Sequence, residues 1–152
     1  MTAVEASRVK IGLGNTTTEI GELFRVEGEV GDDRLTLEGD LSRVQGLGSA
    51  MSTGTLEIRG SVGPMLGSRM SGGTIDVHGS AGDWAGAEIS GGLIRIRGDA
   101  GNFVGAAYPG SRLGMKEGAI LIDGSAGEDV GLSMRRGLIV VRGNAAAGLG
   151  RS

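Results

Sequence analysis

The chain has 152 residues, of which 32 are glycine and only four are aromatic, and it contains no cysteine. Its hydrophobic content of 39% is too high for a disordered chain, and its glycines lack the every-third spacing of collagen. A net charge of −3 is not typical of a protein that binds nucleic acid through a basic surface. The absence of cysteine excludes disulfides, thiolate zinc sites and iron–sulfur ligation by this chain.

Targeting and membrane signals are also missing from the sequence. Residues 1–14 carry an early acidic residue, Glu5, and no apolar core, so we expect no signal peptide. No apolar run approaches the ~20 residues of a membrane span. One histidine, His78, is too few for a multi-histidine metal site. We expect a cytoplasmic protein with no membrane partner, no nucleic-acid partner and no cofactor of its own.

Residues 1–34 fit no repeat and are predicted to form a leading segment or cap. Strands are expected at residues 10–14 and 23–26, with a turn at residues 31–33. From residue 35 to residue 152 the pattern changes, and we interpret this part as a single repeat domain.

The repeat domain is marked by a glycine that follows each short apolar segment. The spacings between these glycines are 21, 19, 19, 26 and 19 residues, which predicts six coils with a seven-residue insertion around residues 108–114. The glycines are Gly39, Gly60, Gly79, Gly98, Gly124 and Gly143. A second glycine follows seven residues later in most copies, at Gly67, Gly86, Gly105, Gly131 and Gly150, with Gly48 as its counterpart in the first copy. Both sets are interpreted as structural turn residues.

Each coil contains two apolar residues in strict alternation, such as Leu56 and Ile58, and this period of two indicates a strand. A second short strand is expected to end at Leu66, Ala85, Val104, Val130 and Leu149. A helix is excluded because glycine at this density would cost about 1 kcal/mol per site. We therefore predict an all-β fold, a right-handed parallel β-helix of about six 19-residue coils spaced ~4.8 Å apart. Its last coil leaves an open sheet edge, to be covered by a partner or by further chain.

The repeat resembles a known family, that of the glycine-repeat subunit found in formylmethanofuran dehydrogenase and in the bacterial formyltransferase/hydrolase complex. The similarity covers residues 15–150. It is carried by the segments ELFRVEGEVGDDRLTLEGDLSRV (22–44), GTIDVHGSAGDWAGAEISG (73–91), VGAAYPGSRLGM (104–115) and VGLSMRRGLIVVRG (130–143). The C-terminal domain of the glutamate synthase large subunit shares the glycine repeat, but the DWAG and YPGSR segments favour the first family.

This resemblance implies a non-catalytic subunit of a complex in one-carbon metabolism, where formyl groups move between tetrahydromethanopterin and methanofuran. It implies an amidohydrolase-like subunit and a formyltransferase subunit as partners. Zinc, or a molybdenum or tungsten pterin, is expected only in those partners. Family members carry more chain at both ends than this sequence does. Two alternatives remain open: a glutamate-synthase-like scaffold domain without an active site of its own, and a free-standing carbohydrate-active β-helix.

Two outward columns of side chains are predicted along the strands. One contains Thr36, Glu57, Asp76, Arg95, Leu121 and Val140, and the other contains Glu38, Arg59, His78, Arg97, Asp123 and Arg142. Glu57 and Asp76 would lie ~5 Å apart, near the separation of a retaining glycosidase pair. The neighbouring arginines favour ion pairing instead. His78 is interpreted as a solvated surface residue between two arginines.

Interface candidates come from positions that break the pattern. Leu121 and Val140 place apolar side chains where earlier coils have polar ones, which predicts a covered face. The insertion presents Tyr108 and Arg112, residue types enriched at interfaces, and Trp84 lies in a surface turn. These five residues are the candidates for contacts with partner subunits. The alternatives are cover by further chain of its own for Leu121 and Val140, and a solvated excursion for the loop and Trp84. We predict no catalytic, cofactor-binding or metal-binding residue.

Overall fold

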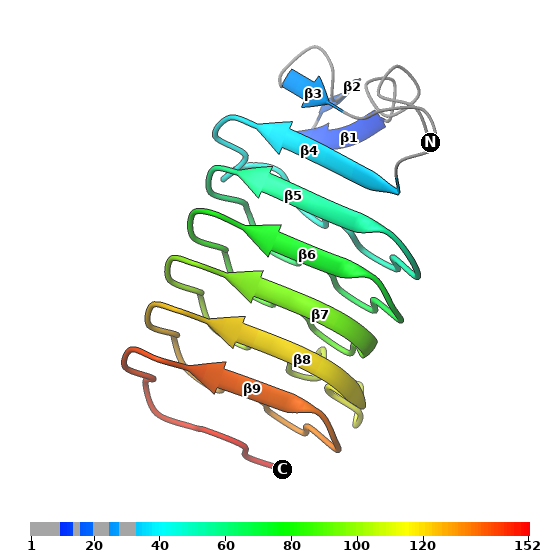
Figure 1. Cartoon of the computed structure of the whole chain (residues 1–152). Coiled ribbons are helices and arrows are strands. Elements are labelled where there is room, and N and C mark those ends of the chain that lie inside the picture. The colour runs from blue at the N-terminus through cyan, green and yellow to red at the C-terminus, as the bar shows by residue number, and fades with distance from the viewer. Residues whose placement is uncertain (1–9, 14–15, 20–24, 28–32) are drawn as a thin grey trace.

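The computed structural model describes residues 10–13, 16–19, 25–27 and 33–152. All regular secondary structure in this part of the chain is strand, wound into a β-solenoid of about six turns (Figure 1). Six parallel strands form one face of the solenoid: β4 (Arg34–Glu38), β5 (Thr55–Arg59), β6 (Thr74–Val77), β7 (Ser90–Ile96), β8 (Glu117–Ile122) and β9 (Leu138–Val141). The predicted solenoid is confirmed. The described residues contain no helix long and apolar enough to cross a bilayer.

The register of the sheet follows the sequence repeat residue by residue. Each inward position pairs with its counterpart in the next coil, as Leu56 does with Ile75 and Ile58 with Val77. The complete inward columns are Leu35, Leu56, Ile75, Ile94, Ile120 and Ile139, and Leu37, Ile58, Val77, Ile96, Ile122 and Val141. A one-residue slip would turn every inward side chain outward, so the alternation specifies the register.

The interior is a stack of aliphatic columns. Met70, Ile89 and Met115 are fully buried at one repeat position, and the isoleucines of β6, β7 and β8 are fully buried beside them. On the wall that follows the glycine corner of each strand, isolated parallel bridges connect Leu41, Val62, Ala81, Ala100, Ala126 and Ala145. The buried core of the described residues consists of Leu, Ile, Val, Met and Ala and contains no aromatic ring.

The predicted second strand of each coil does not form, and this part of the prediction is wrong. The backbone immediately before Leu66, Ala85 and Val104 is left-handed, at Met65 (φ 64°), Trp84 (φ 63°) and Phe103 (φ 60°). Extended backbone cannot pass through such residues. Hydrogen bonds to the next coil stabilise these corners, as Met65 N donates to Asp83 O at 2.8 Å and Trp84 N donates to Asn102 O at 2.8 Å. In the described coils, the segment between the strand and this corner makes β-type pairs only at a single-residue bridge, which lies four residues before Leu66, Ala85 and Val104.

The glycine that follows each strand lies where coils approach most closely. A Cβ atom at Gly79 would lie 2.7 Å from the Gly60 carbonyl oxygen, and one at Gly98 would lie 2.8 Å from that of Gly79. The second glycine of the coil has a different role, since Gly67 and Gly86 adopt positive φ values of 60° and 64°. Space determines the first position, whereas both the positive φ and the isoleucine Cδ1 atom against the glycine determine the second.

The described residues of the N-terminal part form three strands, β1 (Lys10–Leu13), β2 (Thr16–Glu19) and β3 (Arg25–Glu27). β1 and β2 pair antiparallel, and β3 pairs antiparallel with β4 at the first edge of the sheet. The strand expected at residues 10–14 is therefore present in β1. The one expected at 23–26 is represented by β3, although residues 23–24 and most of the turn at 31–33 lie outside the described residues. The boundary between a leading segment and the repeat at residue 34 stays a prediction.

Candidate functional site

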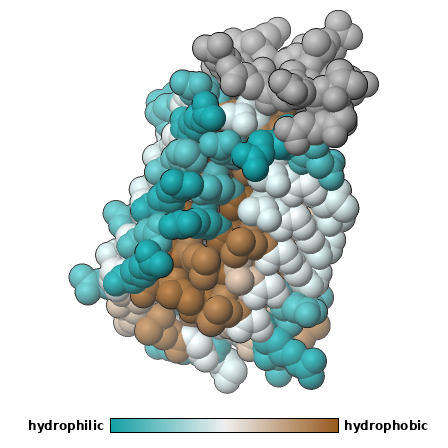
Figure 2. Space-filling view, in the orientation of Figure 1, coloured by the Kyte–Doolittle hydropathy of each residue, from teal (hydrophilic) through white to brown (hydrophobic). Residues whose placement is uncertain are grey.

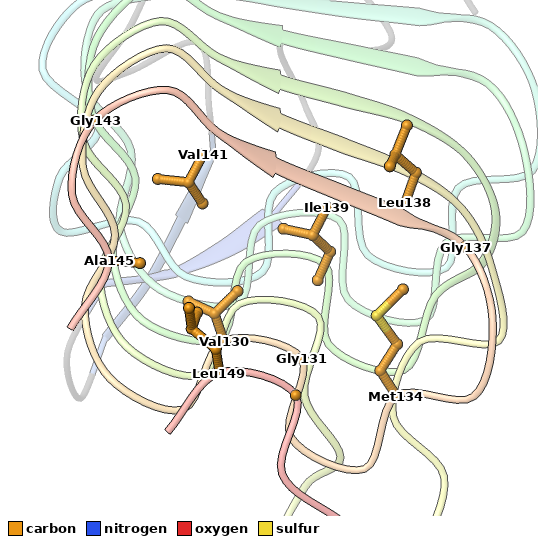
Figure 3. A pocket seen from close by; sticks show the side chains of 11 residues that line it. Val130, Gly131, Met134, Gly137, Leu138, Ile139, Val141, Gly143, Ala145 and Leu149 are labelled. Atoms are coloured by element: carbon orange, nitrogen blue, oxygen red, sulfur yellow. The ribbon is translucent and has the colours of Figure 1, made fainter. Parts of the chain in front are cut away.

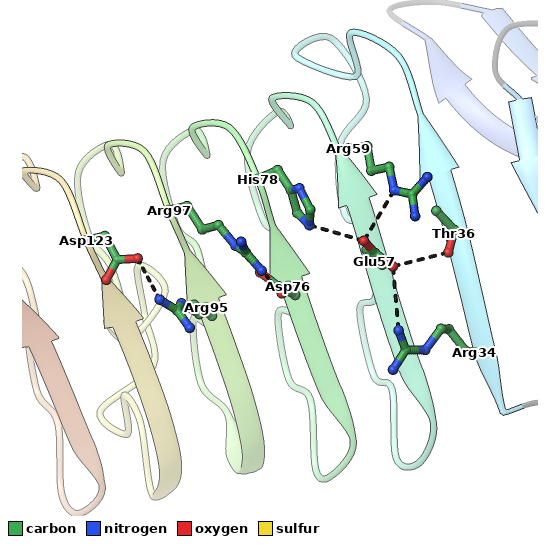
Figure 4. A network of polar contacts seen from close by, with 9 residues as sticks. All are labelled: Arg34, Thr36, Glu57, Arg59, Asp76, His78, Arg95, Arg97 and Asp123. Atoms are coloured by element: carbon green, nitrogen blue, oxygen red, sulfur yellow. Dashed lines mark hydrogen bonds and ion pairs between the residues drawn. The ribbon is translucent and has the colours of Figure 1, made fainter.

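The outer face of the sheet carries a ladder of ion pairs that repeats along one diagonal (Figure 4). Glu57 contacts His78, Asp76 contacts Arg97, and Arg95 contacts Asp123, each pair joining one outward column to the other one coil later. Leu121 occupies the next position of the first column and ends the series. Diagonal neighbours on adjacent strands lie within reach of long side chains, which allows these contacts.

Glu57 accepts the largest number of contacts on this face. Its Oε1 lies 3.3 Å from Arg59 Nε and 3.2 Å from His78 Nε2, while Oε2 lies 3.6 Å from Arg34 Nη1 and 3.5 Å from Thr36 Oγ1. The Glu57 side chain is only 14% exposed. His78 therefore pairs with a carboxylate, a contact that the sequence prediction of a solvated residue missed.

Asp76 is held by a single bidentate partner. Arg97 donates from Nε at 3.0 Å and from Nη2 at 2.6 Å, and these hydrogen bonds hold the pKa of Asp76 below its ordinary value despite partial burial. Asp123, by contrast, contacts two arginines, Arg95 at 3.0 Å and Arg142 at 3.2 Å. Glu57 and Asp76 are strand neighbours, as predicted. Because each is bound to its own cations, their arrangement is that of structural ion pairs.

The polar ladder gives way to apolar side chains over the last three strands. Leu121 pairs with Val140 in the outward column that contains Glu57 and Asp76, and both are half-buried. The preceding outward column is apolar there too, with Leu93, Ala119 and Leu138, the last of which is 55% exposed. Figure 2 shows hydrophobic surface gathered over this end of the face, beside the charged strip. We call Leu93, Ala119, Leu121, Leu138 and Val140 the apolar outer face.

The final coil presents a second apolar surface at the end of the solenoid (Figure 3). Val130, Met134, Ile139, Val141 and Leu149 line a concave region of about 650 Å³. The inward positions that are almost completely buried one coil earlier are half-buried or exposed here, and Leu149 is 61% exposed. No described strand pairs with the outer edge of β9.

The insertion is folded against the solenoid by an aromatic stack. Trp84 stacks on Phe103 with ring centroids 4.4 Å apart and on Tyr108 at 5.0 Å. The Tyr108 hydroxyl shares a 2.7 Å hydrogen bond with the buried Ser68, and the Arg69 guanidinium lies 5.5 Å from the Tyr108 ring centroid. Tyr108 thus connects the fourth coil to the second. The stack had a sequence signal, since Trp84 and Phe103 occupy the same position of successive 19-residue repeats.

Glu88 completes the attachment of the insertion. It accepts hydrogen bonds from Arg69 Nε at 3.0 Å and from the Tyr108 amide at 3.2 Å. Burial alone would raise the pKa of Glu88, but hydrogen bonds from Ser111, Arg69 and Tyr108 outweigh burial and lower it. The structure therefore brings Tyr108 and Trp84 together in an intramolecular cluster. Arg112, which the sequence analysis proposed as an interface residue together with Tyr108 and Trp84, is exposed in the part of the insertion that follows Tyr108.

Among the described residues, no three histidine or carboxylate side chains are grouped as metal ligands. No family model and no curated protein matches the sequence. The solved structures include a close match. One chain of the formyltransferase/hydrolase complex (FhcABCD) from Methylorubrum extorquens, determined in complex with methylofuran, superposes with a TM-score of 0.86 and 36% sequence identity over 97% of this chain.

The chain is similar to a subunit of the formyltransferase/hydrolase complex. The resemblance predicted from the glycine repeat is thereby confirmed. The present chain spans 56%, about half, of the length of that subunit. The likeness extends over nearly the whole solenoid, including the coils that carry the ion-pair ladder and the apolar outer face.

Proposed function

We propose that this chain is a non-catalytic structural subunit of a formyltransferase/hydrolase-type complex in one-carbon metabolism. The proposal rests on the 36% identity and the TM-score of 0.86 to a chain of such a complex. Its partners would be an amidohydrolase-like subunit and a formyltransferase subunit, and the zinc, or a molybdenum or tungsten pterin, would be bound by those partners. Formyl groups carried by tetrahydromethanopterin and methanofuran would react there.

The chemistry of the outer face supports a structural role. A catalytic carboxylate pair needs one group that remains protonated and one that is free to attack or to activate water. Glu57 instead has two arginines and a histidine within 3.6 Å, and Asp76 has a bidentate arginine. The hydrogen bonds from Arg97 hold the pKa of Asp76 below its ordinary value, which disfavours that carboxyl as a general acid. The lone pairs of Glu57 are already engaged by its neighbours.

The apolar outer face supports a role in assembly. Leu138, Leu121 and Val140 form a continuous aliphatic surface on a rigid sheet, and such a surface is typical of a protein–protein contact. Leu121 and Val140, together with the exposed Arg112 and the outer surfaces of Tyr108 and Trp84, remain the proposed subunit contacts.

The test is affinity purification of the tagged chain from its source cells, with mass spectrometry of the proteins that copurify. Recovery of amidohydrolase-like and formyltransferase subunits in a fixed ratio is expected. Recovery of the chain alone, as a monodisperse species, would contradict the proposal. A second arm adds the purified chain to the other subunits expressed without it, and a structural subunit should restore their assembly without changing the isolated subunits' chemistry.

A further inference from the structure

The cations of residues 33–152 fall into two groups, those that pair with a carboxylate and those that do not. The paired arginines are Arg34, Arg59, Arg69, Arg95, Arg97, Arg142 and Arg151. The cations that form no ion pair with another described residue are Arg43, Arg112, Lys116, Arg135 and Arg136, and all of them are exposed. Arg43 lies in the first coil. We call the other four, which come from the insertion and from the segments that lead into β8 and β9, the basic corner.

Two members of the basic corner lie on neighbouring coils at the same position of the repeat. Lys116 and Arg135 are separated by the same 19 residues as Ala119 and Leu138, which are paired between β8 and β9. The Arg135 amide donates to the carbonyl of Met115, the residue before Lys116, at 2.8 Å. Two like charges at neighbouring positions repel each other, and a carboxylate bound between them would replace this repulsion with attraction.

Arg112 adds a third cation from the insertion. It lines a small hollow together with Arg135, and Ser111 and Ser133 are also part of the lining. Guanidinium groups donate hydrogen bonds in a planar fork that fits a carboxylate. The one carboxylate nearby in the sequence, Glu117, forms no ion pair with a described cation. The basic corner therefore has an excess of positive charge.

The basic corner borders the apolar outer face. Arg136 precedes Leu138, the first residue of β9, by two residues. At the carboxyl ends of the strands, Arg142 lies against Asp123, whose carboxylate also binds Arg95, so this flank has more positive than negative charge as well. An aliphatic surface is thus flanked by positive charge on both sides, in a chain whose net charge is −3.

The composition of this surface indicates what kind of partner fits it. Two copies of the chain placed face to face would bring like charges together, which is unfavourable. Nucleic acid would satisfy the cations through its phosphates, but it would not cover aliphatic side chains such as Leu138, which is 55% exposed. A protein surface with an aliphatic centre and a rim of carboxylates complements both parts.

We propose that the basic corner and the apolar outer face form one docking surface for an acidic surface of a partner subunit. Aliphatic side chains of the partner pack on Leu121, Leu138 and Val140, and its aspartates or glutamates pair with the basic corner. The inference rests on the proposed function for the existence of a partner subunit, and it specifies the chemistry by which that partner is recognised.

Zero-length cross-linking of the affinity-purified complex tests the contact directly. A carbodiimide joins an amine to a carboxylate that touches it, and Lys116 is one of only two lysines in the chain. A cross-link from Lys116 to an aspartate or glutamate of a copurified subunit is expected. Arg135→Lys should add a second cross-link to that subunit. Arg43→Lys, at an exposed cation without an ion pair in the described chain, should add none.

Charge reversal measures the contribution of the basic corner to binding. Lys116→Glu, and separately Arg135→Glu/Arg136→Glu, should weaken the affinity for the other subunits at least ~10-fold at about 50 mM salt and less than ~3-fold at about 500 mM, because added ions screen rim charges. Arg43→Glu is the matched control and should bind as the parent does at both salt concentrations. Arg135→Lys/Arg136→Lys keeps the charge and should remain close to the parent.

Several outcomes would overturn the inference. If the other subunits copurify but Lys116 forms no cross-link to them and the charge-reversed variants bind as the parent does, the docking surface is wrong and the proposed function stands. Cross-links from Lys116 to carboxylates of the same chain or of a second copy would replace the partner as occupant. Binding of short double-stranded DNA that is lost in the same variants would identify nucleic acid instead.

The two proposals also fail separately in the other direction. Cross-links from Lys116 to acidic residues of proteins that are not formyltransferase/hydrolase-type subunits would refute the proposed function and support the docking surface. Recovery of the chain alone would refute both.

Discussion

Arg97 and Asp76 lie one coil apart in different outward columns, and Arg97 donates two hydrogen bonds to that single carboxylate, at 3.0 and 2.6 Å. The same diagonal relates Glu57 to His78 and Arg95 to Asp123. The charges of the last pair are reversed relative to Asp76 and Arg97, yet the geometry is kept. The stacking of the coils therefore determines which two positions meet along the diagonal, and the two side chains at those positions only need to be complementary in charge or hydrogen bonding.

This pair predicts a pH-dependent contribution to stability. The folded state lowers the pKa of Asp76 below its ordinary value of 3.8, so the contribution is complete well above that value. It is lost as pH falls through 3.8 and then through the folded-state pKa. Asp76→Asn should lower the free energy of unfolding by about 0.5–1 kcal/mol at pH 7, since the exposed Arg97 is screened by solvent.

Denaturant unfolding at about pH 7 and at about pH 2.5 checks this prediction. The difference between Asp76→Asn and the parent should be smaller at the lower pH, because the parent's Asp76 contribution is lost as pH falls below 3.8. Glu128→Gln removes an exposed carboxylate that forms no ion pair in the described part of the chain, and it is the matched control. An Asp76→Asn deficit that is undiminished at the lower pH would show that the effect does not arise from ionisation.

Packing in the inward columns predicts a large loss for a single truncation. Ile94 is fully buried, with its Cδ1 atom against Gly67, so Ile94→Ala should reduce the free energy of unfolding by about 2–5 kcal/mol. Leu113→Ala, at a position that is 44% exposed, should change it by less than about 0.5 kcal/mol. Equal losses in the two variants would contradict the assigned core.

The close approach of coils at the first glycine column predicts intolerance to one methyl group. Gly79→Ala should destabilise the solenoid by about 1–3 kcal/mol, because its Cβ would lie 2.7 Å from a backbone carbonyl oxygen that cannot rotate away. Gly79 lacks a positive φ, so the loss would arise from space and not from backbone preference. Thermal unfolding measures it, and an unchanged midpoint would count against so close a packing of the coils.

The attachment of the insertion predicts separable effects at Tyr108. Tyr108→Phe removes only the hydroxyl bonded to Ser68 and should cost about 0.5–1.5 kcal/mol. Tyr108→Ala also removes the stack on Trp84, so amide exchange of residues 107–114 should accelerate. Trp84 is the only tryptophan, and its fluorescence should change in Tyr108→Ala and remain close to the parent in Tyr108→Phe. Arg112→Ala, in the exposed part of the same loop, is the control.

The apolar outer face predicts loss of assembly without loss of folding. Leu121→Asp/Val140→Asp should abolish copurification of the partner subunits while the circular dichroism spectrum stays that of the parent, because both side chains are on the outer face of the sheet. Thr55→Asp/Thr74→Asp also introduces two aspartates on the outer side of the sheet, but in β5 and β6, away from the apolar outer face, and it should leave assembly unchanged. Retained copurification by the first double variant would place the subunit contact elsewhere.

The strand register was predictable because neighbouring coils repeat one another. Leu56, Ile75 and Ile94 recur at 19-residue intervals, and burial of like residues over like requires them to stack. The second strand of each coil was not predictable in this way. The left-handed residue at that corner is Met65 in one coil and Trp84 in the next, residue types that rarely adopt positive φ, so local preference indicated extended backbone.

The sequence by itself determined the period, the six coils and the inward columns, because these depend only on which positions must be buried. Tertiary structure decided which surface residues meet. The diagonal contact of Asp76 with Arg97 depends on how far these side chains reach across neighbouring strands, and the contact of Tyr108 with Ser68 depends on the path by which the insertion crosses two coils. Neither contact follows from the repeat alone, because the repeat specifies which residue lies directly above each position and not which residue lies beside it.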